Sequence, residues 1–233
     1  MAQVINPTIL IVGLGKMGSA LVNGWITQNI NPNKIHVIEP NLDQVKELEC
    51  KSVNLYRAPN EISNDFFPDI IVFAIKPQIM DIVVPEYRRF KEKSAYISIA
   101  AGKSISFFES FLGGGPPIIR AMPNTPASIG EGITIACGNK KVSKKYKNYF
   151  FHLFEALGQA EWINDEKLMD AVTAISGSGP AYVFLLAETL TNAGEKAGLD
   201  RNMAQRLSIQ TIMGSSLMLN SSQESPSALR KNV

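Results

Sequence analysis

Short apolar runs recur along the chain as far as residue 165, and segments with helical spacing lie between them. The runs are continuous rather than alternating, which is typical of strands buried on both faces of a sheet. The segments between them repeat apolar residues at three- and four-residue steps, which indicates helices packed on that sheet. The alternation predicts an α/β domain with a parallel sheet. Predicted strands span residues 8–13, 34–39, 53–56, 69–75, 94–100, 117–121, 132–138 and 160–165, and predicted helices span 17–28, 42–50, 79–90, 105–111 and 143–157.

The strand pattern disappears after Asp165, and only helical spacing follows. Helices are predicted over residues 166–175, 181–197 and 202–219. We therefore predict two domains, an α/β domain over residues 1–164 and an all-helical domain over residues 165–233.

Composition narrows the class of protein. Of the 233 residues, 45% are hydrophobic and 19% are charged, and the net charge is +2. This balance gives no electrostatic reason to expect nucleic acid or a membrane surface as a partner. No apolar run approaches the ~20 residues that cross a bilayer, and the N-terminus lacks the pattern of a signal peptide. Cys50 and Cys137 are too few for a disulfide framework, and His36 and His152 have no metal-ligand spacing. We expect a globular cytoplasmic protein without a metal.

A glycine-rich turn follows the first predicted strand. Gly13, Gly15 and Gly18 form the pattern G-x-G-x-x-G where that strand gives way to a helix. In this context Gly13 makes a tight turn, Gly15 lets the backbone approach a pyrophosphate, and Gly18 lets the helix pack closely on the strand. The unpaired N–H groups at the helix start suit a phosphate. The pattern predicts a Rossmann dinucleotide-binding domain, and a tight turn without a ligand is the alternative.

An acidic residue closes the second predicted strand. Glu39 lies 21 residues after Gly18 (39 − 18), where an acid usually accepts hydrogen bonds from the adenosine ribose and repels a 2′-phosphate. Neither Pro40 nor Asn41 offers the cation that would hold such a phosphate. Glu39 therefore favours NADH, and the alternative is a surface carboxylate at a strand end.

Small or proline-braced loops follow three other predicted strands. They carry Lys76 and Pro77, then Ala100 to Gly102, then Asn124 between two prolines. The carboxyl edge of an open α/β sheet is where ligands bind, so the three loops together outline a cofactor site.

The sequence Ser176-Gly177-Ser178-Gly179-Pro180 interrupts a helical pattern with poor helix formers. Each Gly costs about 1 kcal/mol relative to Ala in a helix and Pro about 3 kcal/mol. We expect a broken helix with a new start near Pro180, whose N–H groups and neighbouring hydroxyls would bind a small carboxylate. A kink that only redirects the chain is the alternative.

Five blocks together resemble a known family: "GLGKMGSAL", "AIKPQ", "SIAAG", "RAMPNTPASIGEG" and "AVTAISGSGPAYVFLLAETLTNAGEKAGL". From about residue 8 to Val233 the chain is similar to the pyrroline-5-carboxylate reductases. The resemblance implies NAD(P)H-dependent reduction of the cyclic imine 1-pyrroline-5-carboxylate to L-proline, the last step of proline biosynthesis. It also implies a Rossmann domain followed by an all-helical dimerisation domain, and hence a homodimer or a higher homo-oligomer.

The resemblance assigns roles to the matching positions. Because the protonated imine already accepts hydride well, the protein mainly has to position the reactants, and no catalytic acid is named. Thr173 and Ser178 are candidates for polar contacts only. The predicted substrate-binding residues are Ser176, Gly177, Ser178 and Gly179, and the predicted cofactor-binding residues are Gly13, Gly15, Lys16, Met17, Gly18, Glu39, Ala74, Lys76, Pro77, Ala100 and Asn124.

The chain departs from the family pattern in two ways. The family more often prefers NADPH, whereas Glu39 favours NADH, so the expected cofactor is NAD(P)H with the choice left open. The chain also ends before the family's Ser-Pro-Gly-Gly-Thr-Thr loop, so we expect its helical domain to lack a C-terminal end. Two alternatives remain, a dinucleotide-binding protein without turnover and a β-hydroxyacid dehydrogenase-like oxidoreductase, for which Lys167 or Lys196 would be the available lysines.

Overall fold

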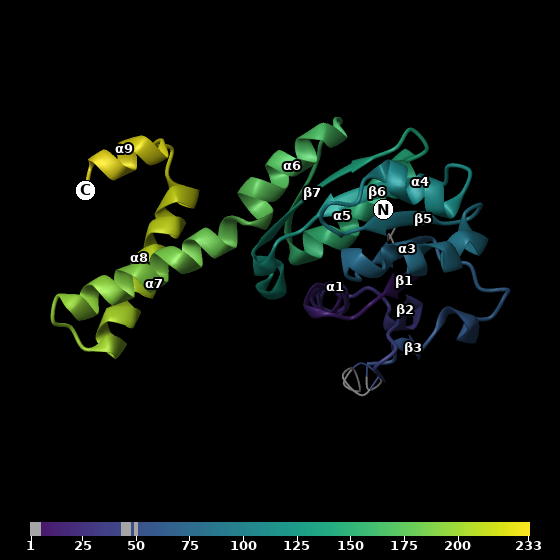
Figure 1. Ribbon diagram of the computed structural model, residues 1–233, viewed down its shortest axis with the longest axis horizontal. Helices are drawn as coiled ribbons and strands as arrows, with labels where there is room; N and C mark the ends of the chain where they lie inside the picture. The colour runs from purple at the N-terminus through teal and green to yellow at the C-terminus, as the bar shows by residue number, and fades with distance from the viewer. Residues whose placement is uncertain (1–5, 43–47, 49–50) are drawn as a thin grey trace. The chain divides into compact units, whose positions relative to one another are not determined.

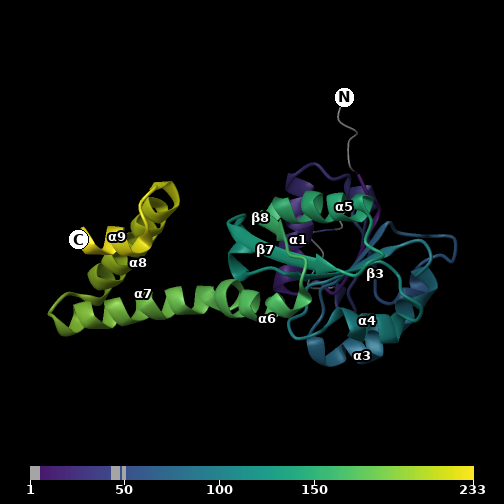
Figure 2. The same cartoon turned by 90° about the horizontal axis from the view of Figure 1, so that it is seen from above.

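The computed structural model describes residues 6–42, 48 and 51–233, and contains an eight-stranded sheet with helices on both faces (Figures 1 and 2). The strands are β1 (Ile9–Val12), β2 (Ile35–Ile38), β3 (Asn54–Tyr56), β4 (Ile70–Phe73), β5 (Ala95–Ser98), β6 (Ile118–Met122), β7 (Gly132–Gly138) and β8 (Gly158–Trp162). The α-helices are α1 (Lys16–Thr27), α3 (Met80–Val83), α4 (Ile105–Leu112), α5 (Lys144–Phe154), α6 (Met169–Val172), α7 (Gly179–Lys196), α8 (Arg201–Ser221) and α9 (Pro226–Lys231).

The strand order is β3-β2-β1-β4-β5-β6-β7-β8. The pairs from β3 through β6 are all parallel, so the order of the first six strands is that of a doubly wound Rossmann sheet. Strand β7 runs antiparallel to β6, and β8 runs parallel to β7. The predicted fold class, a Rossmann domain followed by helices, is confirmed.

The central strands are apolar on both sides because helices cover both faces of the sheet. Within β1, Ile9 and Ile11 belong to one core cluster with residues of α1 and α5, while Leu10 and Val12 belong to a second with residues of α3 and α4. Figure 2 shows α5 and α4 on opposite sides of the sheet. The period of two along each strand thus divides the core into two layers.

The helix predicted over residues 79–90 is mostly a tighter helix. Only Met80–Val83 is α-helical, and a 3₁₀ helix spans Val84–Phe90. Pro85 lies at the start of that 3₁₀ helix, and a proline ring cannot donate the backbone hydrogen bond that would continue α3. The helix predicted over residues 42–50 lies almost wholly outside the described residues.

Residues Ser178–Val233 form a second compact unit of helices. Asp200 caps α8, since its carboxylate accepts a hydrogen bond from the Met203 N–H at 3.0 Å. A Cβ on Gly194 would lie 3.0 Å from the Cβ of Ala204, so small residues let α7 and α8 approach closely. Helix α9, which we did not predict, begins with Ser225 as its cap and a proline in its first turn.

The first compact unit spans Met1–Gly177 and therefore includes α6. Met169 of α6 is 1% exposed and belongs to the second core cluster of that unit. The predicted boundary between residues 164 and 165 lies before this helix and stays a prediction.

The chain stays helical through most of the predicted break. A π-helical turn spans Thr173–Gly177, a bend follows at Ser178, and α7 starts at Gly179 with Pro180 in its first turn. The new helix start is where we expected it, but the expected break is replaced by a widened turn. In the part of the chain that the structure describes, no helix is long and apolar enough to cross a membrane.

Candidate functional site

The glycine-rich turn has the geometry that its spacing predicts. Gly13 has φ +92°, and a Cβ there would lie 2.6 Å from the Ile75 side chain. A Cβ on Gly18 would lie 2.4 Å from the backbone oxygen of Gly13, so only glycine allows α1 this close to β1. Around Gly15, by contrast, nothing lies within 4 Å of an added Cβ. Lys16 and Met17 follow as the first residues of α1. Tight packing at two glycines and open space at the third fit a pyrophosphate held against this turn.

The carboxylate of Glu39 is held from two sides. Its Oε2 accepts a hydrogen bond from the Leu14 N–H at 2.9 Å, and its Oε1 accepts one from the Asn41 N–H at 3.1 Å. The Glu39 N–H in turn donates to the Tyr56 carbonyl at 2.9 Å. The side chain is therefore joined to the glycine-rich turn, a contact that the sequence did not reveal.

The remaining predicted cofactor residues follow β4, β5 and β6 at the same sheet edge. The Cβ of Ala74 would lie 3.4 Å from a Cβ on Gly18, which brings the β4 loop against the glycine-rich turn. Lys76 precedes the 3₁₀ helix that Pro77 begins, and its side chain makes no capping hydrogen bond. Ala100 is 5% exposed, and its N–H donates to the Ser98 hydroxyl at 3.2 Å.

Asn124 has a structural contact that competes with its predicted role. Its Oδ1 accepts a hydrogen bond from the Ile133 N–H at 3.0 Å and so ties the loop after β6 to the start of β7. The residue still lies at the carboxyl end of β6, on the edge where the other predicted cofactor residues gather.

The predicted substrate segment also differs from expectation in its hydroxyls. Thr173 Oγ1 donates to the Met169 carbonyl at 2.8 Å, and Ser176 Oγ donates to the Val172 carbonyl at 2.9 Å. The Ser178 side chain makes no capping hydrogen bond to α7. A Cβ on Gly177 would lie 2.6 Å from the Met122 side chain, so this glycine lets the π-helical turn approach the end of β6. Helical turns of this kind occur frequently at functional sites.

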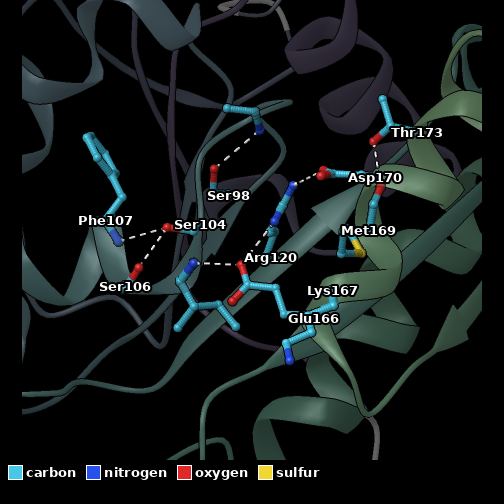
Figure 3. Close-up of polar contacts among 12 residues, drawn as sticks. Ser98, Ser104, Ser106, Phe107, Arg120, Glu166, Lys167, Met169, Asp170 and Thr173 are labelled. Carbon is cyan, nitrogen blue, oxygen red and sulfur yellow. Dashed lines mark hydrogen bonds and ion pairs between the residues drawn. The ribbon is translucent and has the colours of Figure 1, made fainter.

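Two charged residues that the sequence analysis missed join the turn before α6 to the sheet (Figure 3). Arg120 of β6 has a side chain only 9% exposed, and its Nη1 lies 3.0 Å from Glu166 Oε1. The same Oε1 accepts the Ile105 N–H at 2.8 Å, at the first residue of α4. The sequence did contain one signal of this pair, an arginine inside the apolar strand run "PPIIRAM". An arginine in a buried strand predicts a carboxylate beside it, because a buried cation needs an anion nearby.

Two titratable side chains within the sheet, Cys137 and His36, are kept in their neutral forms by burial and do not offer an activated nucleophile. Burial raises the pKa of the Cys137 thiol to about 11, with the nearby Glu166 carboxylate adding to the effect, so the thiolate is disfavoured at neutral pH. Burial also lowers the pKa of His36 to about 4, and this imidazole packs against Phe66 in a tilted arrangement with 4.2 Å between ring centroids. The geometry is that of an NAD(P)-dependent oxidoreductase that binds and orients its reactants.

Comparison with known proteins agrees with this class. Residues 166–233 match the family model described as pyrroline-5-carboxylate reductase dimerisation, and residues 8–102 match one described as NADP oxidoreductase, coenzyme F420-dependent. The chain belongs to the pyrroline-5-carboxylate reductase family. It is 37% identical to the pyrroline-5-carboxylate reductase of Pseudomonas aeruginosa over 98% of this chain and 84% of the relative, and 32% identical to that of Arabidopsis thaliana over 95% and 80%.

Solved structures give the same assignment. A pyrroline-5-carboxylate reductase from Coxiella burnetii superposes with a TM-score of 0.89 at 32% identity, covering 97% of this chain and 84% of that one. The Plasmodium falciparum pyrroline carboxylate reductase, solved with NADP bound, gives a TM-score of 0.86 at 36% identity over 98% and 84%. An imine reductase from Streptomyces aurantiacus is 13% identical with a TM-score of 0.65, and it shares the fold alone.

Proposed function

We propose that this chain reduces 1-pyrroline-5-carboxylate to L-proline with NAD(P)H. The observation that carries the proposal is similarity to pyrroline-5-carboxylate reductases over 98% of this chain, together with a glycine-rich turn of dinucleotide-binding geometry. A bound reduced nicotinamide supplies a hydride, which goes to the carbon of the C=N bond. The nitrogen is already protonated in the iminium form, so the products are proline and the oxidised cofactor.

The residues at the sheet edge bind and orient the cofactor. The N–H groups at the start of α1 hold the pyrophosphate over Gly15, where nothing obstructs its approach. Lys76 and Ala100 follow β4 and β5 and lie on the side of the nicotinamide and its ribose. Buried Ala100 leaves room for a flat ring, and the adjacent strand ends fix its orientation.

The substrate carboxylate binds at residues 176–179. The start of α7 at Gly179 presents backbone N–H groups that have no partner within the helix. Pro180 fits the first turn because it has no N–H group that would need a partner. A helix start attracts an anion without a cationic side chain. Thr173 and Ser176 contribute hydroxyls that are already oriented by bonds to backbone carbonyls.

Glu39 favours NADH, and the comparison of NADH with NADPH described below decides the choice. Its carboxylate is fixed by two backbone N–H groups and cannot turn away without losing them. A fixed negative charge at the end of β2 accepts ribose hydroxyls and repels a 2′-phosphate.

The working assembly is a homodimer built through the helical unit. Consecutive apolar residues of α7 are exposed in the single chain, among them Tyr182 at 64%, Phe184 at 65% and Leu185 at 58%. A surface of this kind marks an interface, and the family model that covers it describes dimerisation. Sedimentation should give at least twice the chain mass, and a monomer at all concentrations would contradict this assembly.

The cytoplasm is the proposed compartment.

The first test is nicotinamide oxidation on addition of 1-pyrroline-5-carboxylate, with NADH and NADPH compared side by side. Turnover that requires the imine establishes the reductase. Cofactor binding without imine-dependent oxidation would instead favour a binding protein.

A further inference from the structure

One carboxylate oxygen joins three segments of the first compact unit. Oε1 of Glu166 accepts hydrogen bonds from the Ile105 N–H at 2.8 Å and from Arg120 Nη1 at 3.0 Å (Figure 3). Ile105 begins α4, Arg120 lies in β6, and Glu166 lies in the 3₁₀ turn that leads into α6. A single acceptor therefore fixes the relative positions of a helix start, a strand and the approach to α6.

Each of the three segments leads to residues that the proposed function uses. The loop before α4 carries Ala100, on the nicotinamide side. The chain after β6 carries Asn124, and α6 continues directly into the π-helical turn that starts at Thr173. The carboxylate of Glu166 thus connects segments that lead to the predicted cofactor residues and to the predicted substrate residues, and Glu166 itself is in neither set.

Burial and charge make this contact specific. The Arg120 side chain is 9% exposed and needs an anion, and Glu166 is 31% exposed. The only other carboxylate paired with Arg120 among the described residues is Asp170, at 3.7 Å from Nη2 and with 94% of its side chain exposed. An exposed partner at that distance contributes little, so the pairing of the buried arginine rests on Glu166.

We propose that Arg120 and Glu166 are positioning residues, which hold the π-helical turn of residues 173–177, with its two predicted substrate residues Ser176 and Gly177, at the distance from the cofactor loops that hydride transfer requires. This inference rests on the proposed function, since it assigns the contact between Arg120 and Glu166 a role in the same reaction. Neither residue is among the predicted substrate- or cofactor-binding residues, so we expect cofactor affinity to be unaffected while the chemical step depends on the pair.

The test compares E166A and the conservative E166Q with D69A, a matched control. Asp69 likewise accepts a backbone N–H, from Thr8 at 3.0 Å, and a cation, Lys145 at 3.2 Å, and it is 34% exposed. It precedes β4, at the amino edge of the sheet and away from the site. We expect E166A to lower kcat at least about tenfold with the NADH dissociation constant changed less than about twofold. E166Q keeps an acceptor oxygen and should recover part of kcat, whereas D69A should keep kcat within about twofold of wild type.

Amide hydrogen exchange gives a readout that needs no turnover. E166A should raise exchange in peptides covering residues 173–177, and D69A should not. If the wild type does not reduce the imine, the proposed function fails while exchange still tests the positioning role. An unchanged kcat in E166A, an equal loss in D69A, or unchanged exchange at 173–177 would each overturn the proposal. If E166A does not fold, R120M/E166A removes the unpaired cation and carries the same test.

Discussion

The carboxylate of Glu39 accepts a hydrogen bond from the backbone N–H of Leu14, with 2.9 Å between the two atoms. Leu14 lies between the first two glycines of the glycine-rich turn, so the end of β2 and this turn are joined by a direct hydrogen bond. The acid that we propose selects the cofactor therefore also supports the glycine-rich turn, and substitutions at Glu39 should have two separable effects.

The variants E39Q and E39S separate these effects. E39Q removes the charge but keeps an acceptor for Leu14, so the ratio of kcat/KM for NADH to that for NADPH should fall about tenfold, equivalent to 1.4 kcal/mol. E39S also loses the contact with the loop and should weaken both cofactors. Steady-state kinetics with each cofactor gives the ratio. If the ratio is the same in wild type and both variants, the carboxylate does not face the ribose.

Gly15 and Gly18 should respond differently to alanine. A Cβ at position 18 meets the Gly13 backbone oxygen at 2.4 Å, so G18A should lower the melting temperature of the cofactor-free protein by several degrees. At Gly15 the Cβ meets nothing, and φ is −66°, so G15A should leave that temperature within about 1 °C of wild type. G15A should nevertheless weaken cofactor binding at least about tenfold, because the methyl group occupies the approach to the pyrophosphate. Thermal unfolding and a cofactor titration check both, and equal losses of stability would refute the distinction.

The sheet could be predicted from the sequence because its signal is local. Each strand between Ile9 and Met122 overlaps a predicted strand, and the central strands β1, β4 and β5 are buried on both faces, where patterning is strongest. The antiparallel direction of β7 could not be predicted, since an apolar run carries no information on which way it pairs. Helix α9 was missed because six residues are too short to show helical spacing.

The glycine-rich turn could be predicted from the spacing of its glycines, whereas the polar contacts of the candidate site could not be predicted from the sequence. The hydroxyls of Thr173 and Ser176 donate hydrogen bonds to the carbonyls four residues earlier. Whether such a hydroxyl makes this bond or points into a site depends on the local helix geometry, which the sequence does not give. The π-helical turn differs from an α-helical one by a single residue, which is below the resolution of sequence patterns. The pairing of Arg120 with Glu166 joins residues 46 apart, and a single sequence contains nothing that links them.

Trp25 should be a stability determinant through its indole nitrogen. The side chain is fully buried, and Nε1 donates to the Leu153 carbonyl at 2.8 Å, which joins α1 to α5. W25F removes the donor and leaves a cavity and an unpaired carbonyl, so it should cost about 2–4 kcal/mol of unfolding free energy. Trp162, which is partly exposed beneath Lys147, offers the matched control, and W162F should cost about 1 kcal/mol or less. Urea unfolding followed by circular dichroism is suitable because it does not depend on tryptophan fluorescence, and similar losses in both variants would contradict this role.

His36 should make the fold sensitive to mild acid. Burial lowers its pKa to about 4 from 6.5, and its Nδ1 lies 3.1 Å from the Tyr56 hydroxyl, from which a neutral imidazole can accept a hydrogen bond. As the pH falls from 6.5 to 4, the unfolded chain takes up the proton before the folded one does, so the folded state loses stability over that window.

The expected loss between pH 7 and pH 5 is about 1 kcal/mol, after allowance for partial exposure of the ring to solvent. H36Q cannot be protonated and should remove this part of the pH dependence, while H152Q, which removes the other histidine, should leave it in place. Urea midpoints of wild type and both variants at the two pH values provide the measurement. A loss that persists in H36Q would place the titrating group elsewhere, and a loss that disappears in H152Q would assign it to His152.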